Sequence, residues 1–351
     1  MMGLHDHFLM QVANTMDKKR RNRVLCVAGL LVGLALLAWW AKTWWGVPRS
    51  AAAFVKRGNE YGAKDRPDQA IADFTEAIRL DQKNADAYRL RGMQYNRKEE
   101  YDKAIADYSK ALDLNSHDST AYVFRGRAHY HRKEYEKAVA DYSMALDLDS
   151  RDSDAYVFRG RAYYDIQEYD KAIADFTAAI ELDRTDWFAY RVRGDAYQEV
   201  KNYDKAIADY TKVLDRRPED VTTYRLRARA YDTKKAYANA VADYTKVVDL
   251  DPKDIQSHDR LALLLAGAPE DSVRDGKRAV AHATMACDLS DWKNTYHLGT
   301  LAAAYAECGD FDEAVKWQKR KIELLLDTKA DVEAAREWAN WYEGRKPFRL
   351  R

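Results

Sequence analysis

A period of 34 residues constrains the fold of this chain more than any other feature. An aromatic residue, a glycine, an alanine and an aspartate each recur at this spacing, six times in succession, with one alanine in the place of a glycine. A fixed period of this length indicates stacked supersecondary units rather than one globular core. Such a stack presents a long surface, so the expected function is to hold other molecules. The four registers are Phe54, Tyr88, Tyr122, Tyr156, Tyr190 and Tyr224; Gly58, Gly92, Gly126, Gly160, Gly194 and Ala228; Ala70, Ala104, Ala138, Ala172, Ala206 and Ala240; and Asp73, Asp107, Asp141, Asp175, Asp209 and Asp243.

The charge balance and the cysteine count narrow the function classes. The 351 residues include 58 Lys and Arg against 57 Asp and Glu, which gives a net charge of +1. A dedicated nucleic-acid binder carries a basic excess, so we expect no nucleic-acid partner. Three cysteines are too few for a disulfide framework or a metal cluster. We expect Cys287 and Cys308 to be small buried thiols, and the alternative is that the last helical units bring them together as a disulfide.

The N-terminal region contains a candidate membrane span. Residues 24–41 carry no charge, and a helix over residues 24–45 would be roughly 33 Å long, enough to cross a hydrocarbon layer of ~30 Å. Five basic residues lie between positions 18 and 23, and four tryptophans lie at the far end. The basic flank stays in the cytoplasm, so we expect a single-pass protein with residues 1–23 inside and the repeats on the periplasmic or exoplasmic side.

A cleaved signal peptide is the alternative interpretation of this segment, because it has the same order of basic and apolar residues. The tryptophans stand where a small-residue cleavage site would follow, which favours an uncleaved signal anchor. Gly29 and Gly33 form a Gly-x-x-x-Gly pair that allows two such helices to approach closely. The pair is a weak indication of a homodimer.

Each 34-residue unit is predicted to form two amphipathic helices. In residues 119–152, apolar and small residues recur at spacings of three to four, first around Gly126 and then around Tyr142. Gly126 and Ala138 carry almost no side chain, so the two helices can pack closely there while Tyr142 fills the space beside them. One pair of helices leaves an apolar face exposed, and the next pair covers it.

These units resemble tetratricopeptide repeats. That family has an aromatic residue at the fourth position, glycine at the eighth, tyrosine at the eleventh, alanine at the twentieth and an aromatic residue at the twenty-fourth. The residues that carry the resemblance in the unit 119–152 are Tyr122, Gly126, Tyr130, Ala138, Tyr142 and Ala145. The resemblance implies an all-α, right-handed α-solenoid of about eight helix-turn-helix repeats. We divide the whole chain into a basic N-terminus (1–23), a transmembrane anchor (24–45), six regular units (51–254), two divergent units (255–327), and a capping helix with a tail (328–351).

The units depart from the family pattern at the seventh position, which is arginine instead of leucine. One arginine and one aspartate in each of six layers predict a repeating ion-pair ladder along the stack. Partly buried pairs of this kind fix register more than they add stability, so we expect a structural role for them. The predicted ladder consists of Arg57, Arg91, Arg125, Arg159, Arg193 and Arg227 with Asp73, Asp107, Asp141, Asp175, Asp209 and Asp243.

The resemblance also implies a ligand groove lined by side chains of the first helix in each unit. In the family this groove takes extended peptides, and an excess of arginine here suits an acidic or carboxylate-bearing segment. The alternative is that these are ordinary solvated charges on exposed helix faces. The corresponding residues are Arg89, Met93, Asn96, Val123, Arg127, His131, Val157, Arg161, Tyr164, Arg191, Asp195, Gln198, Arg225, Arg229 and Asp232.

The sequence contains no nucleophile, phosphate-loop or metal-binding signature, and its histidines are scattered or poorly spaced. The carboxylate clamp of chaperone-binding family members is not matched either, because only Asn59 fits. We therefore expect a non-enzymatic, membrane-anchored adaptor without a cofactor that binds protein or peptide partners. The alternatives are a structural subunit that assembles through its membrane helix, an adaptor of inverted topology, and a secreted repeat protein if the N-terminal segment is cleaved.

Overall fold

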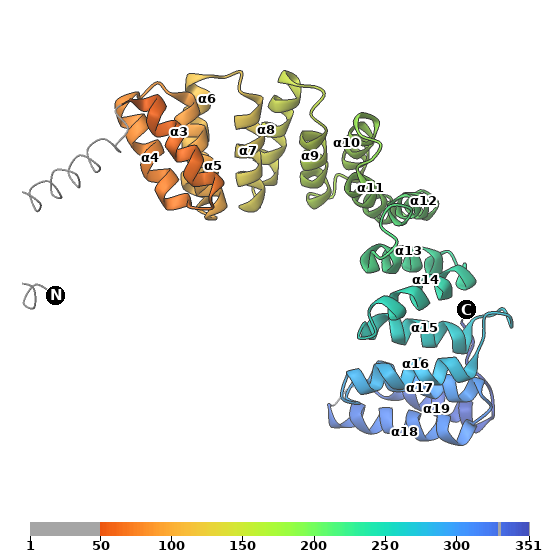
Figure 1. Ribbon diagram of the computed structural model, residues 1–351. Helices are drawn as coiled ribbons and strands as arrows, with labels where there is room; N and C mark the ends of the chain where they lie inside the picture. The colour runs from red at the N-terminus through yellow and green to blue at the C-terminus, as the bar shows by residue number, and fades with distance from the viewer. Residues whose placement is uncertain (1–49, 329–330, 351) are drawn as a thin grey trace, which may run out of the picture. The chain divides into compact units, whose positions relative to one another are not determined.

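The computed structural model describes residues 50–328 and 331–350 (Figure 1). Within these ranges the chain forms seventeen α-helices and no strand. The helices are α3 (Ala51–Ala63), α4 (Pro67–Leu80), α5 (Ala85–Arg97), α6 (Tyr101–Leu114), α7 (Ser119–His131), α8 (Tyr135–Leu148), α9 (Ser153–Asp165), α10 (Tyr169–Leu182), α11 (Trp187–Glu199), α12 (Tyr203–Leu214), α13 (Val221–Thr233), α14 (Tyr237–Leu250), α15 (Ile255–Gly267), α16 (Gly276–Leu289), α17 (Thr295–Glu307), α18 (Phe311–Asp327) and α19 (Glu333–Glu343).

The predicted membrane segment, residues 24–45 with Gly29 and Gly33, lies outside the described residues and stays a prediction. Among the helices that are described, none combines the length and the apolar character needed to cross a membrane.

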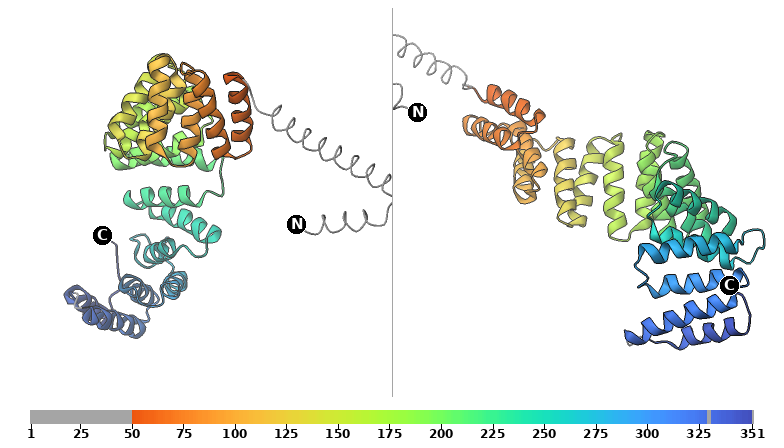
Figure 2. Two further views of the ribbon diagram at one scale, coloured as in Figure 1. Left: turned by 90° about the vertical axis from the view of Figure 1, so that its left-hand side faces the viewer. Right: turned by 60° about the horizontal axis from the view of Figure 1, so that its bottom comes forward.

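The chain divides into two compact units, one ending at Ala128 and the other beginning at His129. Inside the first unit α3 packs on α4, α4 on α5 and α5 on α6. Inside the second unit each helix from α9 to α19 packs on the next one, and α9 also touches α11, as α15 touches α17. Figure 2 shows this succession of paired helices from two further directions. Each unit is therefore built by covering one helix pair with the next, as tetratricopeptide repeats are.

A repeated pair of signals sets the ends of the first helix in each repeat. The residue before most first helices is an acid or amide that caps it; Asp152, for example, accepts a hydrogen bond from the backbone N–H of Ala155. The turn after the first helix contains a residue with a positive φ at a constant spacing: Asp65, Glu99, Lys133, Gln167, Lys201 and Lys235. A left-handed residue at this place stops the helix and turns the chain back, although no glycine stands there. In the last repeat the position is Gly309, with φ +79°.

The glycine register marks the closest approach between the two helices of a repeat. A Cβ atom on Gly160 would lie 2.6 Å from a ring carbon of Phe176, and one on Gly194 would lie 2.8 Å from a ring carbon of Tyr210. The aromatic rings of the second helices occupy the space that the glycines leave free, as the sequence pattern predicts. Each regular repeat in the second unit has only a thin core; one such core consists of Val157, Ala179, Ile180 and Ala189.

The C-terminal part from α15 onward has a thicker core, which the chain's tail helps to cover. The ring of Phe348 packs over Gly267, and the backbone N–H of Leu350 donates to the carbonyl of Gly267 at 2.7 Å. Cys287 is buried, Cys308 is exposed, and both are free thiols. The disulfide alternative is therefore wrong, and so is the expectation that Cys308 is buried, because Cys308 lies at the exposed C-cap of α17.

Candidate ligand-binding face

The arginine and aspartate registers meet inside the repeats. In the first unit Arg57 and Arg91 contact Asp73 and Asp107, with N···O distances of 2.6–2.7 Å. In the second unit Arg159, Arg193 and Arg227 contact Asp175, Asp209 and Asp243, each through two hydrogen bonds of 2.8 Å. Each of these pairs is bidentate, joins the first helix of a repeat to its second helix, and holds a nearly buried carboxylate. Asp141 is also buried, in α8.

A hydroxyl register completes these contacts, and sequence reasoning missed it. Arg159 donates through Nη1 to Ser143 Oγ at 3.1 Å, and Arg193 does the same to Thr177 Oγ1. Each hydroxyl belongs to the second helix of the preceding repeat, so one guanidinium bridges two repeats. The signal was present in the sequence as a Ser or Thr every 34 residues: Thr75, Ser109, Ser143, Thr177, Thr211 and Thr245. In the first unit Arg91 contacts Thr75 and Arg125 contacts Ser109 in the same way.

These arginines are held as permanent cations. Hydrogen bonding to Asp107 raises the pKa of Arg91 above its ordinary value, and hydrogen bonding to Asp175 does the same for Arg159. A guanidinium with a raised pKa cannot act as an acid or a base near neutral pH. The chemistry of the pairs is therefore that of a fixed, directional connection between helices.

The predicted groove residues separate into buried and accessible ones. Val123 and Val157 are 9% and 4% exposed, so the prediction that they line an open groove is wrong. Val157 packs against Ala179, Ile180 and Ala189, because the fifth position of the first helix points at the next repeat when its side chain is short and apolar. His131 and Arg229 are exposed, and the remaining predicted groove residues are partly buried: Arg89, Met93, Asn96, Arg127, Arg161, Tyr164, Arg191, Asp195, Gln198, Arg225 and Asp232.

In the first unit the groove arginine Arg89 is already neutralised. Its guanidinium contacts Asp86 at 2.7 Å and Asp118 at 3.0 Å. Met93 packs against a core that includes Ala104, Tyr108 and Ala128. These two side chains stabilise the packing of the unit, and neither offers a free charge to a ligand.

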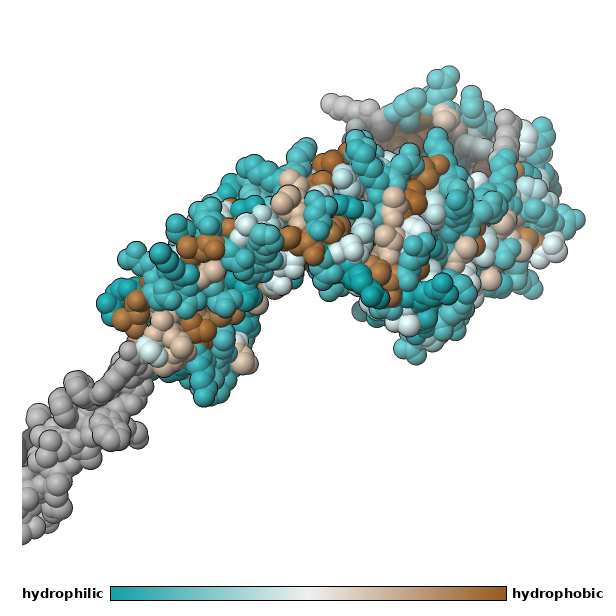
Figure 3. All heavy atoms as spheres, turned by 90° about the horizontal axis from the view of Figure 1, so that it is seen from above, coloured by the Kyte–Doolittle hydropathy of each residue, from teal (hydrophilic) through white to brown (hydrophobic). Residues whose placement is uncertain are grey.

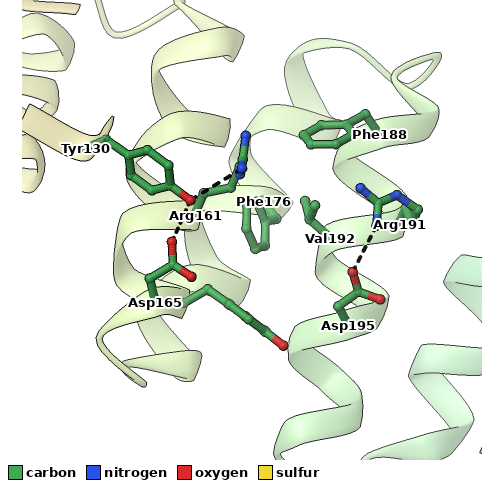
Figure 4. Close-up of a pocket in the computed structure, with 9 residues that line it drawn as sticks. Tyr130, Arg161, Asp165, Phe176, Phe188, Arg191, Val192 and Asp195 are labelled. Atoms are coloured by element: carbon green, nitrogen blue, oxygen red, sulfur yellow. Dashed lines mark hydrogen bonds and ion pairs between the residues drawn. The ribbon is translucent and has the colours of Figure 1, made fainter. Parts of the chain in front are cut away.

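In the second unit the structure brings four of the predicted residues, Arg161, Tyr164, Arg191 and Asp195, into one pocket of about 270 Å³ (Figure 4). The pocket lies between α9 and α11, with Phe176 of α10 in its wall and Tyr130 from the end of α7 at its side. Sequence reasoning missed five of its residues: Tyr130, Asp165, Phe176, Phe188 and Val192. Only the packing of neighbouring repeats places these five beside the predicted four.

Arg161 is the accessible cation of this pocket. Its Nη2 donates to the hydroxyl of Tyr130 at 3.3 Å, and its guanidinium lies 5.2 Å from the centre of the Tyr130 ring and 5.8 Å from that of Phe188. Among the residues that the structure describes, no carboxylate lies within ion-pair distance of Arg161. Arg191, in contrast, contacts Asp195 at 3.2 Å.

Two carboxylates, Asp165 and Asp195, form the other side of the pocket, and each accepts a hydrogen bond from a phenol. Tyr130 donates to Asp165 at 2.5 Å, and Tyr210 donates to Asp195 at 2.9 Å. Burial raises the pKa of the Asp195 carboxyl above its ordinary value. Burial, together with the hydrogen bond to Asp165, raises the pKa of Tyr130 to about 12. Tyr130 therefore stays a neutral donor at physiological pH.

A second pocket of about 360 Å³ lies on α13 and α15. It contains the predicted groove residues Arg225, Arg229 and Asp232. Two of its arginines are neutralised, because Arg225 contacts Asp254 at 2.5 Å and Arg260 contacts Asp232 at 2.5 and 2.9 Å. Arg229 is the exposed cation of this pocket.

The sequence predicts scattered, isolated histidines, but two of them lie side by side in the structure. His258 of α15 and His282 of α16 lie with their Nδ1 atoms 3.1 Å apart, and Nε2 of His258 lies 3.2 Å from the carbonyl of Pro252. Within residues 50–328 and 331–350, no three potential His, Cys, Asp or Glu ligands are grouped so that they could hold a metal ion. The two rings form a contact between α15 and α16, which their separation of 24 residues in the sequence does not indicate.

Models of the tetratricopeptide repeat match residues 55–119, 95–153, 153–186 and 191–255, together more than half of the chain. The chain belongs to the tetratricopeptide repeat family, whose members are non-catalytic scaffolds for protein interaction. No curated protein sequence matches the chain at a significant level.

Three solved structures illustrate the likeness. The C-terminal part of a repeat-containing protein from Cytophaga hutchinsonii is 22% identical with a TM-score of 0.61, and the match covers 70% of this chain and 98% of that one. PilF of Pseudomonas aeruginosa is 19% identical with a TM-score of 0.52, over 60% of this chain and 96% of that one. YrrB, described as a TPR protein with an unusual peptide-binding site, is 23% identical with a TM-score of 0.49, over 52% and 95% of the two chains. At these identities the first two likenesses support the fold alone.

Proposed function

We propose that this chain is an adaptor that binds an extended segment of a partner protein on the first-helix face of its second unit. The observation that carries the proposal is the pocket between α9 and α11, where a partly buried guanidinium, Arg161, has aromatic rings on two sides and no carboxylate partner. Of the other arginines predicted to line the groove in this unit, Arg191 and Arg225 are paired with carboxylates and Arg229 is exposed.

The chemistry of the pocket favours a carboxylate on the ligand. A guanidinium forms paired hydrogen bonds with a carboxylate, and the flanking rings of Tyr130 and Phe188 fix its plane. The floor of the pocket is apolar, with Phe176 and Val192, so an aliphatic or aromatic group can be buried beside the carboxylate. A protein segment supplies both groups on neighbouring residues. Small anions supply only the first, so they would bind more weakly.

The surface of the chain is consistent with specific rather than non-specific binding of partner proteins. It is largely hydrophilic in the view of Figure 3, and its hydrophobic residues form small separate patches. A single pocket with an unsatisfied charge is a more specific feature than a broad apolar surface.

Affinity capture from detergent-solubilised membranes tests the proposal. The native chain is compared with Arg161→Glu and with a matched control, Arg184→Glu, which reverses an exposed charge in the turn between α10 and α11, outside both pockets. We expect Arg161→Glu to lose partners that the native chain and the control retain, with the helical content unchanged by circular dichroism. Identical partner lists from all three proteins would contradict the proposal.

We further propose that residues 24–45 anchor the adaptor in a membrane, with residues 1–23 in the cytoplasm and the repeats on the periplasmic or exoplasmic side. The support is the uncharged segment, its basic flank and its tryptophans. Thiol labelling of single cysteines placed at position 10 and in the exposed turn at Lys201 tests the topology. Protection of the first site and labelling of the second by an impermeant reagent in intact cells is the expected result, and the reverse would support the inverted adaptor.

The alternative is a structural subunit that dimerises through Gly29 and Gly33. Changing both glycines to isoleucine separates the two functions. Loss of assembly, with capture of the same partners through the pocket, would favour the structural role.

A further inference from the structure

The pocket between α9 and α11 has a basic edge and an acidic edge. Arg161 precedes Asp165 by four residues on α9, and Arg191 precedes Asp195 by four residues on α11. Four residues are one turn of helix, or about 6 Å along its axis. Figure 4 shows both arginines toward one end of the pocket and both aspartates toward the other, with Phe176 and Val192 between them.

On α9 the chain itself neutralises neither charge. Arg161 and Asp165 lie on one helix but do not contact each other, and among the described residues neither has an ion-pair partner. The hydroxyl of Tyr130 lies between them, since it accepts from Arg161 at 3.3 Å and donates to Asp165 at 2.5 Å. On α11, in contrast, Arg191 and Asp195 form an ion pair at 3.2 Å. The positive charge of Arg161 and the negative charge of Asp165 are therefore the ones that are separated and each open to an external partner.

An extended chain matches this separation. Side chains two residues apart in an extended segment point the same way and lie about 6.6 Å apart. An acidic residue followed or preceded by a basic one at that spacing can therefore meet Arg161 and Asp165 together. A ligand with only an acidic group would leave the acidic edge facing its backbone, which adds repulsion or nothing.

We propose that the pocket between α9 and α11 selects a dipolar segment, with an acidic side chain at Arg161 and a basic side chain two residues away at Asp165. The inference rests on the proposed function, because it specifies which extended segments the adaptor binds there. The segment lies along the groove between α9 and α11, with its acidic residue toward the N-terminal end of α9. The two charges thus determine the direction of the bound chain as well as its composition.

Fluorescently labelled peptides provide the test, with the full chain in detergent and binding followed by anisotropy. The dipolar probe is acetyl-Ala-Glu-Ala-Lys-Ala-amide, and two controls replace either the glutamate or the lysine by glutamine. We expect the dipolar probe to bind about tenfold more tightly than either control, which corresponds to one additional charge contact of ordinary strength.

Variants then assign each charge to its partner. Arg161→Gln is expected to abolish the preference for glutamate while the preference for lysine remains, and Asp165→Asn is expected to do the opposite. Arg184→Gln, in the turn between α10 and α11 and outside the pocket, is the matched control and leaves both preferences unchanged. The exchange Arg161→Asp with Asp165→Arg is expected to invert the favoured order of the two charged residues.

The outcomes separate this inference from the proposed function. Equal binding of the dipolar and the glutamate-only probes, or no effect of Asp165→Asn, overturns the dipolar pocket and leaves a carboxylate-binding adaptor. Absence of binding by all probes also overturns the dipolar pocket, and partner capture with Arg161→Glu then decides the proposed function independently.

Discussion

The regular repeats α3 to α14 and the C-terminal part α15 to α19 build the same helix pairs with different interactions. In the regular repeats the ladder positions are arginine and aspartate, and Arg193 holds Asp209 through two hydrogen bonds of 2.8 Å. In the next helix pair the corresponding residues are Leu261, one period after Arg227, and His282, which is the seventh residue of α16 as Asp243 is of α14. Leu261 is fully buried in a large apolar cluster. At these positions a charge pair connects the helices of the regular repeats, whereas a buried leucine connects those of the C-terminal part.

The difference shows how one backbone arrangement tolerates two kinds of sequence. A bidentate pair is directional, so it fixes how two helices register, but burying its charges offsets much of the stability that it adds. An apolar cluster is less directional and contributes in proportion to the area it buries. The strict 34-residue period persists where ion pairs set the register and loosens where the apolar cluster does, because an apolar core tolerates varied residues of suitable volume.

The largest effect is expected from the apolar part. Leu261→Ala removes a fully buried side chain, so it should lower the free energy of unfolding by about 4 kcal/mol. Urea unfolding followed by circular dichroism measures the change. Leu80→Ala in α4, where the leucine is 45% exposed, is the matched control and should cost less than about 1 kcal/mol. Equal losses of unfolding free energy in the two variants would contradict the prediction that the buried area of the leucine determines its contribution.

In the regular repeats, removing one partner of a charge pair should destabilise the chain, and replacing both partners by apolar residues should restore stability. Asp209→Asn leaves the mostly buried guanidinium of Arg193 without its counter-ion, and we expect a loss of about 3 kcal/mol. Replacing both residues, Arg193→Met with Asp209→Leu, removes the burden of burying charge and should restore stability to within about 1 kcal/mol of the native chain. A double-mutant cycle in urea measures the coupling. Additive losses would contradict a direct interaction between the two side chains.

Replacing a glycine by alanine should change stability differently in the regular repeats and in the C-terminal part, by a smaller amount than the changes above. Gly160→Ala places a Cβ 2.6 Å from the ring of Phe176, so overpacking should cost about 2 kcal/mol. Gly299→Ala places its Cβ 2.9 Å from Nζ of Lys321, the end of a flexible side chain that can move away. There the better helix propensity of alanine should make the change neutral or stabilising by up to about 1 kcal/mol. Thermal unfolding of both variants checks the sign.

The smallest effect is the pH dependence of stability that His282 contributes in the C-terminal part. Burial, with the neighbouring His258 and Arg278, lowers the pKa of His282 to about 4, while Asp249 acts in the opposite direction. The ring is neutral in the folded chain and takes up a proton more readily when unfolded, with an ordinary pKa of about 6.5. Its contribution is thus complete above pH 6.5 and is lost as the pH falls from there toward 4. Because the ring is partly solvated, we expect a loss of about 1 kcal/mol between pH 7 and pH 5.

Urea titrations of the native chain and of His282→Gln at several pH values measure this dependence. The variant should show a flatter profile between pH 7 and pH 5. An unchanged slope would assign the dependence to other groups.

Much of the regular architecture follows from the sequence because its determinants are local. The glycine and aromatic registers predict where two helices of a repeat touch, and the arginine and aspartate registers predict which side chains share a layer. The hydroxyl register, from Thr75 to Thr245, is less conspicuous in the sequence because two residue types, serine and threonine, occupy it. The positive-φ turn residues left no such signal, since lysine, glutamate, aspartate and glutamine occupy a place where glycine is the usual choice.

By itself, the sequence determined the repeat, the helix pairs and the partners within each layer, because residues at a fixed spacing on neighbouring helices must meet. Only the tertiary structure decided which charges remain open. Arg161 and Arg191 both precede an aspartate by four residues, yet only Arg191 contacts its own aspartate, because Tyr130 from the end of α7 lies between Arg161 and Asp165. Likewise Val123 and Val157 differ from the arginines in the same register by being buried. Whether a side chain is buried, neutralised or available depends on the neighbouring repeats that surround it, and spacing along one helix does not contain that information.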